Sequence, residues 1–260
     1  MQSKYHWKRD YHDDSAVYAH QNETFKLVNP TSLPTKIDLR HFCSLVADQG
    51  QLGSCTGNAL VGAVEFLENK AKEFEVNGKF VSLSRLFIYY NERNLEGTVS
   101  QDDGAQLSDG IKSLASQGVC TETAWPYITH RFAVKPSDAA YTDAATRKIS
   151  AYARVDRSNG IQGIKQALAS GYPIVFGFMV YSAFESDSVA ESGILHMPDF
   201  ATEKCMGGHA VLMVGYDDST KRVIVRNSWG SSWGQGGYFT MPYDYVTNLN
   251  LANDFWTITK

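Results

Sequence analysis

Apolar residues in the first half of the chain recur with the period of about 3.6 residues that an amphipathic helix requires. The longest such stripe runs from Thr56 to Phe74 and stops at the turn signal Asn77-Gly78. Similar stripes predict helices over residues 84–94 and 107–117. We therefore expect a helical lobe over about residues 37–150.

After Arg147 the apolar residues gather in short continuous runs, which are typical of buried strands. A short helix is expected near residues 161–169, and Asp217 to Thr220 has the composition of a tight turn between two strands. The expected strands cover residues 173–180, 209–216, 223–227 and 237–241. A β-rich lobe over about 151–250 that follows a helical lobe predicts the α+β class, with a site in the cleft between the lobes.

Residues 1–36 differ from both lobes, because they are polar and aromatic and end near the prolines Pro30 and Pro34. We interpret them as an N-terminal extension that precedes a main domain over residues 37–260. Their position suggests a short propeptide that docks on the cleft or blocks it. The alternative is a packed N-terminal arm without a regulatory role.

The composition argues against several classes of protein. Hydrophobic residues make up 43% and charged residues 20%, as in ordinary globular domains, and the net charge is -4 with no long run of either sign. We therefore expect no nucleic-acid partner. The longest apolar stretch, residues 174–180, is far shorter than the roughly 20 residues of a membrane-spanning helix, so no membrane span is expected. Met1 is not followed by the apolar core of a signal peptide.

Cys55 stands directly before the strongest predicted helix, after a glycine-bearing turn. The unpaired N–H groups and the positive end of a helix dipole stabilise an anion at this position, so we expect the thiol to ionise more easily than a free cysteine. A thiolate is a strong nucleophile. The alternative is a buried structural cysteine, which is the commoner role of that residue type.

Two further polar residues stand at the ends of predicted strands. His209 opens one strand and Asn227 closes the next, and adjacent antiparallel strands bring the start of one beside the end of the other. The Asn227 carboxamide would then hold the His209 imidazole in the orientation for an ion pair with Cys55. Taken singly, a strand histidine is more often structural. His196 is the nearest other base, but no strand with a matched asparagine follows it.

Together these residues resemble the papain-like cysteine peptidases, and the similarity is closest to compact bacterial members with a Gly-Ser-Cys-Thr segment. Gln49 stands six residues before Cys55, as the oxyanion-hole glutamine of that family does. Asn227-Ser-Trp-Gly and the segment Trp233-Gly-Gln-Gly-Gly-Tyr238 match the family's pattern from its asparagine onward. The similarity spans about residues 37–241, which is most of the chain.

The resemblance implies a two-lobed α+β fold with a helical left lobe, an antiparallel β-barrel-like right lobe and the active site in the cleft between them. It implies a cysteine-type endopeptidase that cleaves protein or peptide substrates through a thioester acyl-enzyme. Cys55 would be the nucleophile, His209 the acid and base, and Asn227 the residue that orients His209. Gln49 would donate to the oxyanion, a contact typically worth about 2.7–4 kcal/mol. Trp229 would shield the His209–Asn227 hydrogen bond from water.

The substrate-binding residues are implied less specifically. Asp103-Gly104-Ala105 is similar to the segment along which the family holds an extended substrate backbone, but a Gly-Ala pair is equally expected at any tight entry to a helix. Gly208 would leave the specificity pocket without an acidic side chain, which favours an apolar side chain in the substrate. No metal or cofactor is expected, and the enzyme is expected to be a monomer.

Two positions depart from the family pattern. Thr56 stands where an aromatic residue is usual, and Leu52 replaces a cysteine that forms a disulfide near the nucleophile. Apart from the nucleophile, three cysteines remain, and they allow one disulfide. The resemblance favours Cys43 with Cys120, with Cys205 as the alternative partner. It also implies a secreted or otherwise exported protein whose signal peptide is absent from this chain.

Two other functions are compatible with the same motif. One is a related Cys-His-Asn acyl-transfer enzyme, such as a deamidase or a transpeptidase, which the motif does not distinguish from an endopeptidase. The other is a catalytically silent binding protein on the same fold. The presence of Gln49, Cys55, His209 and Asn227 argues against the silent protein.

Overall fold

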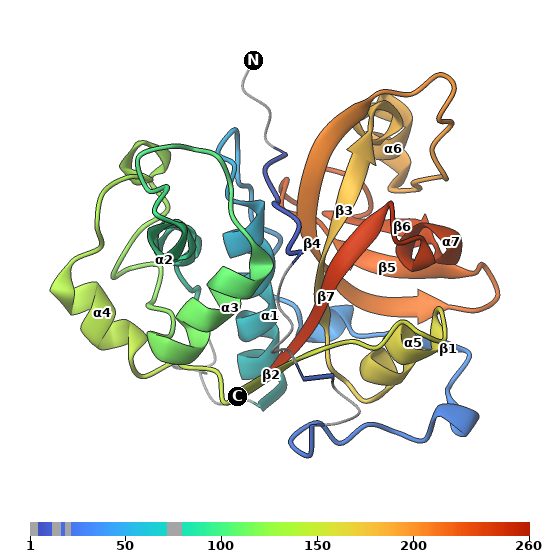
Figure 1. Ribbon diagram of the computed structural model, residues 1–260, viewed down its shortest axis with the longest axis horizontal. Helices are drawn as coiled ribbons and strands as arrows, with labels where there is room; N and C mark the ends of the chain where they lie inside the picture. The colour runs from blue at the N-terminus through green and yellow to red at the C-terminus, as the bar shows by residue number, and fades with distance from the viewer. Residues whose placement is uncertain (1–4, 12–16, 19–21, 72–79) are drawn as a thin grey trace.

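The computed structural model describes residues 5–11, 17–18, 22–71 and 80–260. Helices α1 to α4 gather on the left of Figure 1, and the strands form a second body on the right. This arrangement confirms the predicted two-lobed α+β class. Helix α1 lies where the two lobes meet.

The described part of the helical lobe contains α1 (Cys55–Ala71), α2 (Arg85–Glu96), α3 (Leu107–Ser116) and α4 (Asp138–Ala144). The first three helices confirm the prediction, although the predicted end of the first near Phe74 lies outside the described residues. Ser84 caps α2 by accepting a hydrogen bond from the Phe87 N–H, and Gly97 ends it with a φ of 72°. The apolar pattern does not predict α4, because this short helix contains one large apolar residue, Tyr141.

The described residues contribute seven strands to one antiparallel sheet. The strand order is β2-β7-β3-β4-β5-β6, and β1 pairs with β4 off this path. Their bounds are β1 (Lys36–Asp38), β2 (Ala151–Arg154), β3 (Ile174–Tyr181), β4 (Cys205–Asp217), β5 (Arg222–Arg226), β6 (Tyr238–Pro242) and β7 (Ala252–Thr259). The four predicted strands are confirmed as β3 to β6, with β4 starting earlier than expected.

Three strands escape prediction for a physical reason. β1 and β2 have only three and four residues, too few for a period to be recognised. β7 carries Asn253 and Asp254 in its interior, which interrupt its apolar pattern. Paired with β3 on one side and β2 on the other, β7 nevertheless lies inside the sheet.

The remaining helices of the β-rich lobe are short. They are α5 (Gln162–Ala169), which was expected, and α6 (Asp187–Ser192) and α7 (Tyr243–Thr247), which were not. The predicted turn from Asp217 to Thr220 joins β4 to β5, and this pair is antiparallel as expected. Among the described residues no helix combines the length and the apolar character needed to cross a membrane.

One hydrophobic core joins the lobes. It includes Leu60 of α1, Phe176 of β3 and Val211 of β4, and it also includes Tyr5 and Trp7. Residues 5–11, which we call the N-terminal arm, run between the lobes in Figure 1. The arm is therefore packed into the body of the molecule, between the helical and the β-rich lobe.

Candidate active site

Cys55 is the first residue of α1, and its side chain is fully buried. Its sulfur accepts hydrogen bonds from the backbone N–H groups of Ala210, His6 and Thr56, which favour the thiolate. Burial outweighs them and raises the pKa of the Cys55 thiol to about 11. The expected lowering of this pKa is therefore wrong for this arrangement, because the N-terminal arm excludes water from the sulfur.

His209 and Asn227 come together through the pairing of β4 with β5. His209 Nε2 lies 2.9 Å from Asn227 Oδ1, and both side chains are buried. The Ser228 N–H donates to the same Oδ1 over 2.9 Å, which identifies that atom as the amide oxygen. Nε2 of His209 therefore carries a proton and donates it, and Nδ1 is the nitrogen that can exchange a proton with a reacting group.

Aromatic rings surround the imidazole. The Trp229 ring stacks on His209 with a centroid distance of 5.3 Å and an angle of 29° between the planes. The Phe178 ring meets it edge-on at 5.8 Å, and Trp233 packs against Trp229 in turn. Rings on several sides reduce the access of water to the His209–Asn227 hydrogen bond, which strengthens that bond.

Gln49 is buried and is fixed at both ends of its amide group. Ser228 Oγ donates to Gln49 Oε1 over 2.6 Å, and Gln49 Nε2 donates to the Leu52 carbonyl over 2.9 Å. The Gln49 N–H also donates to the Ser228 carbonyl over 2.9 Å. The residue after Asn227 thus positions Gln49 in the turn that leads to the nucleophile, so the two lobes are linked at the site.

The N-terminal arm fills the cleft and contacts three of the expected substrate-binding residues. The Trp7 N–H donates to the Gly208 carbonyl over 2.9 Å, and the Lys8 N–H donates to the Ala105 carbonyl over 3.0 Å. Gly104 has a φ of 70°, and a Cβ atom there would lie 1.7 Å from the His6 carbonyl oxygen. Three of the residues expected to bind substrate, Gly104, Ala105 and Gly208, therefore all contact the N-terminal arm.

Side chains of the arm occupy two places beside the nucleophile. The buried Trp7 indole lies over Gly177 and Gly208, where Cβ atoms would come within 2.0 Å and 2.6 Å of it. The Tyr5 ring packs against His209, and its hydroxyl donates to Glu185 over 2.8 Å. The sequence predicted that the N-terminal extension docks on the cleft, but it did not single out Tyr5 and Trp7 as the residues that fill it. The signal that could have found them is the density of aromatic residues in a segment otherwise polar.

Two comparisons of sequence settle the relationship of this chain to known proteins. A family model described as papain family cysteine protease matches residues 33–258. The chain belongs to this family. An uncharacterized peptidase C1-like protein of Acanthamoeba polyphaga mimivirus is 46% identical over 252 residues, covering 92% of this chain and 79% of that protein. A cathepsin B-like protein of Giardia intestinalis is 30% identical over 225 residues, covering 82% and 70%.

A solved structure agrees with the sequence comparisons. The crystal structure of xylellain, a cysteine protease from Xylella fastidiosa, is 39% identical and superposes with a TM-score of 0.86. The match covers 100% of this chain and 97% of xylellain. The resemblance noted from the motifs is thus confirmed, and the chain is a papain-like thiol hydrolase.

All four cysteines of this peptidase are free thiols. The expected disulfide between Cys43 and Cys120 is therefore wrong, and Cys205 forms none either. Cys43 lies beside Arg226 of the β-rich lobe, whereas Cys120 lies beside Ser84 of the helical lobe. Burial raises the pKa of both of these thiols, so each behaves as a small apolar side chain in its own lobe.

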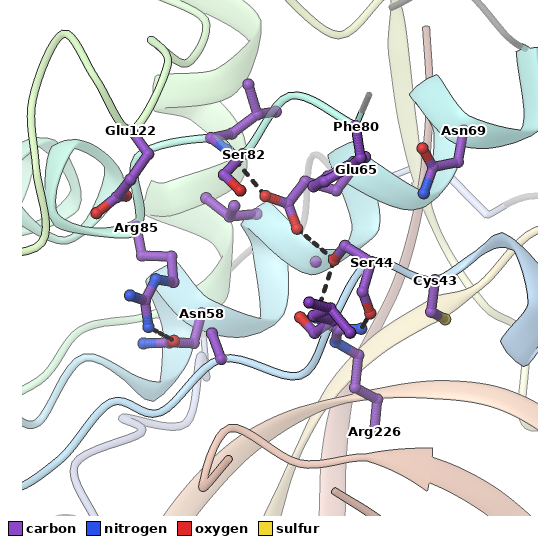
Figure 2. Close-up of a pocket in the computed structure, with 15 residues that line it drawn as sticks. Cys43, Ser44, Asn58, Glu65, Asn69, Phe80, Ser82, Arg85, Glu122 and Arg226 are labelled. Atoms are coloured by element: carbon purple, nitrogen blue, oxygen red, sulfur yellow. Dashed lines mark hydrogen bonds between the residues drawn. The ribbon is translucent and has the colours of Figure 1, made fainter. Parts of the chain in front are cut away.

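A cavity of about 620 Å³ opens beside later turns of α1 (Figure 2). In its wall Ser44 Oγ donates to Glu65 over 2.5 Å, and Arg226 donates to the Leu45 carbonyl over 2.7 Å. Cys55 is not among the residues that line it. The cavity thus borders the loop before the nucleophile and is separate from the cleft.

The other polar candidates do not join this site. His196 is exposed in the segment between α6 and β4. In the part of the chain that the structure describes, no group of three or more His, Cys, Asp or Glu side chains could hold a metal ion.

Proposed function

We propose that this peptidase is an endopeptidase that uses Cys55, His209 and Asn227 as its catalytic group. His209 takes the thiol proton, the sulfur attacks the carbonyl carbon of the substrate, and His209 then gives the proton to the departing amine. A thioester remains on Cys55. Water that loses a proton to His209 attacks this thioester, which releases the new carboxylic acid and restores the thiol.

One observation carries this proposal. The imidazole of His209 is held by the 2.9 Å contact with Asn227, and the N–H of the next residue, Ala210, bonds the Cys55 sulfur. The base and the nucleophile therefore belong to segments in direct contact. Asn227 accepts a hydrogen bond from Nε2, which stabilises the imidazolium that forms when the thiol loses its proton.

We further propose that Gln49 donates to the negative oxygen of the tetrahedral intermediate. Its Oε1 is held by Ser228, so the orientation of the amide group is fixed before substrate binds. The Cys55 N–H, at the unpaired end of α1, would be the second donor. Preorganised donors of this kind typically contribute about 2.7–4 kcal/mol each to transition-state stabilisation.

For substrate binding we propose that Gly104 and Ala105 hold an extended peptide on one wall of the cleft and Gly208 holds it on the other. The main-chain bonds of the arm to Ala105 and Gly208 support this assignment. The place taken by the Trp7 indole would then receive an apolar side chain of the substrate. Trp229 stacks on the His209 ring and would protect this face of the base from water.

We also propose that the N-terminal arm keeps the enzyme inactive until it leaves the cleft. His6 presents a backbone N–H to the Cys55 sulfur, and an N–H group offers no carbonyl carbon for attack. The arm can therefore occupy the cleft without being cleaved at that point. The fully buried Cys55 is inaccessible to a substrate while the arm is docked.

Covalent labelling by an epoxysuccinyl peptide inhibitor, read by intact mass and peptide mapping, tests these proposals. Three proteins are compared, namely the full chain, a version that begins at Asn22, and Cys55→Ala. The shortened version retains Phe25, which packs against Ala153 and so keeps the rest of the extension in place. Cleavage of a fluorogenic peptide is followed in parallel.

Labelling at Cys55 together with peptide cleavage, both absent from Cys55→Ala, is the expected result. Stronger labelling of the shortened chain would support the inhibitory arm, whereas equal labelling of both chains would refute it. Absence of labelling in both chains would favour the silent binding protein. Release of ammonia from glutamine side chains, or transfer of the acyl group to an added amine in preference to water, would favour the acyl-transfer alternative.

A further inference from the structure

Glu92 is a fully buried acid that the proposed reaction does not use. It lies on α2, and its carboxyl group faces the start of α1, where it accepts a hydrogen bond from the Thr56 hydroxyl. Its second oxygen, Oε2, has no hydrogen-bond partner among the described residues. A Cβ atom at Gly110 of α3 would lie 2.7 Å from Oε2 and 2.3 Å from the Leu60 side chain. The acid is thus enclosed by α1, α2 and α3, and it contacts the residue that directly follows the nucleophile.

The surroundings of Glu92 disfavour its charged form. Burial is the largest cause, and it raises the pKa of Glu92 well above the ordinary range. Glu96 on the same helix and Asp109 on α3 act in the same direction, while Arg93 and the bond from Thr56 oppose them. A negative Glu92 would in turn raise the pKa of the Cys55 thiol on α1. A neutral Glu92 therefore favours the Cys55 thiolate more than a charged one would.

Thr56 connects this acid to the sulfur. Its backbone N–H donates to the Cys55 sulfur, while its hydroxyl donates to Glu92. The hydrogen bond ties the first turn of α1 to α2, and it thereby restrains the backbone that carries the Thr56 N–H. Thr56 stands where the family usually has an aromatic residue, so the departure in sequence coincides with a contact to Glu92.

We propose that Glu92 is a positioning residue for the nucleophile: its buried carboxyl group anchors Thr56 and thereby holds the Thr56 N–H on the Cys55 sulfur. Because Oε2 has no hydrogen-bond partner among the described residues of this enclosure, the carboxyl group is expected in its neutral form. This inference rests on the proposed role of Cys55. It assigns a function to a residue that does not touch the substrate, and it explains why a threonine follows the nucleophile in this chain.

The charge of Glu92 is tested directly on the full chain at pH 7 by infrared difference spectroscopy of wild type minus Glu92→Gln. A neutral carboxyl group gives a carbonyl stretch that a carboxylate lacks, and we expect this band in the difference spectrum. A carboxylate band in its place would overturn the proposal. This measurement needs neither substrate nor an open cleft.

The positioning role is tested by titrating the ultraviolet absorbance of the Cys55 thiolate in full chains that carry Trp7→Ala to open the cleft. Each spectrum is taken against the same variant with Cys55→Ala. Thr56→Val removes the hydroxyl but keeps the shape of the side chain, and it should raise the titration midpoint by about one pH unit. At a pH below the midpoint, this shift means a thiolate fraction about tenfold lower than in the parent. Thr56→Ser and Glu92→Gln, which keep the hydrogen bond, should titrate like the parent.

Two results would contradict this inference. If Thr56→Val titrates like the parent, the contact is structural only. If Glu92→Gln lowers the midpoint, the acid acts through its charge. Near-ultraviolet circular dichroism checks that each variant is folded. The titration needs no turnover, so it separates the two proposals. A parent whose Cys55 thiol titrates but which cleaves no peptide would refute the proposed endopeptidase activity. The titration midpoints of the variants would still decide the role of Glu92.

Discussion

The two walls of the cleft are built in different ways. On the helical wall one local element, the first turn of α1, places Cys55 where unpaired N–H groups favour an anion. On the β wall, His209 and Asn227 meet only because β4 and β5 pair in a register that sets Leu212 opposite Arg226. The helical wall therefore places the sulfur, whereas the β wall controls the orientation of the base.

The walls also hold the N-terminal arm differently. The β wall accepts the buried Trp7 indole over Gly177 and Gly208. The helical wall contributes the ion pair between Lys8 and Glu96, in which the Lys8 side chain is 35% exposed. Burial of an aromatic side chain contributes more free energy than an ion pair near solvent. The β wall should thus dominate the docking of the arm.

The largest effect is expected from removing the orienting amide of the β wall. Asn227→Ala deprives His209 of its acceptor, so kcat of the shortened chain should fall on the order of 10²-fold, with KM little changed. Asn227→Asp, which keeps an acceptor oxygen, should lose less. Steady-state kinetics on a fluorogenic peptide gives both values. Wild-type kcat in Asn227→Ala would show that the register of β4 and β5 does not serve the base.

The next effect concerns the space for Trp7. In Gly177→Ala the added Cβ would come within 2.0 Å of the indole, and overpacking of this kind typically costs about 1–3 kcal/mol. Displacement of the arm should speed labelling of Cys55 in the full chain about tenfold or more. The control is the same substitution in the version that begins at Asn22. Its labelling by iodoacetamide, a small reagent that does not fill the space of the indole, should be unchanged. Labelling of the full chain at the parent rate would rule out the indole as the main anchor.

A pH effect should come from the helical wall. Burial raises the pKa of the Cys55 thiol from 9.0 to about 11, so the docked arm favours the neutral thiol. Its contribution to docking is complete below pH 9 and is lost as the pH rises to 11, and at pH 10 docking should be about tenfold weaker. The ratio of labelling rates between the full and the shortened chain, followed from pH 7 to 10, measures this loss. A ratio that stays constant with pH would show that ionisation of Cys55 does not weaken the docking of the arm.

The smallest effect is expected from the ion pair. Lys8→Ala removes the 2.8 Å contact with Glu96, which as a partly exposed pair contributes up to about 1 kcal/mol, or about fivefold in docking. Labelling of the full chain should rise by no more than that factor. Lys112→Ala, which removes the exposed pair with Asp109 on α3, is the matched control. If Lys8→Ala released the arm more fully than Gly177→Ala, the ranking of the walls would be reversed.

Regular local patterns made much of this fold predictable. The apolar stripe of α1 and the runs of β3 to β6 appear in the structure close to their predicted bounds. The predicted strand pair also brought His209 and Asn227 together correctly, because neighbouring antiparallel strands constrain which residues meet. His209 was expected to open its strand but lies inside β4, which begins at Cys205. β7 was missed since Asp254 interrupts its pattern, and sheet pairing with β3 overrides that local signal.

By itself the sequence determined that Cys55 begins a helix and that His209 and Asn227 come from two paired strands, because helix period and hairpin pairing are local properties. Tertiary structure decided the rest. The raised pKa of the thiol, the docking of Trp7 in the cleft and the contact between Thr56 and Glu92 each depend on segments far apart in the chain. Burial and charge arise only when such segments pack together, and no spacing of residues specifies them.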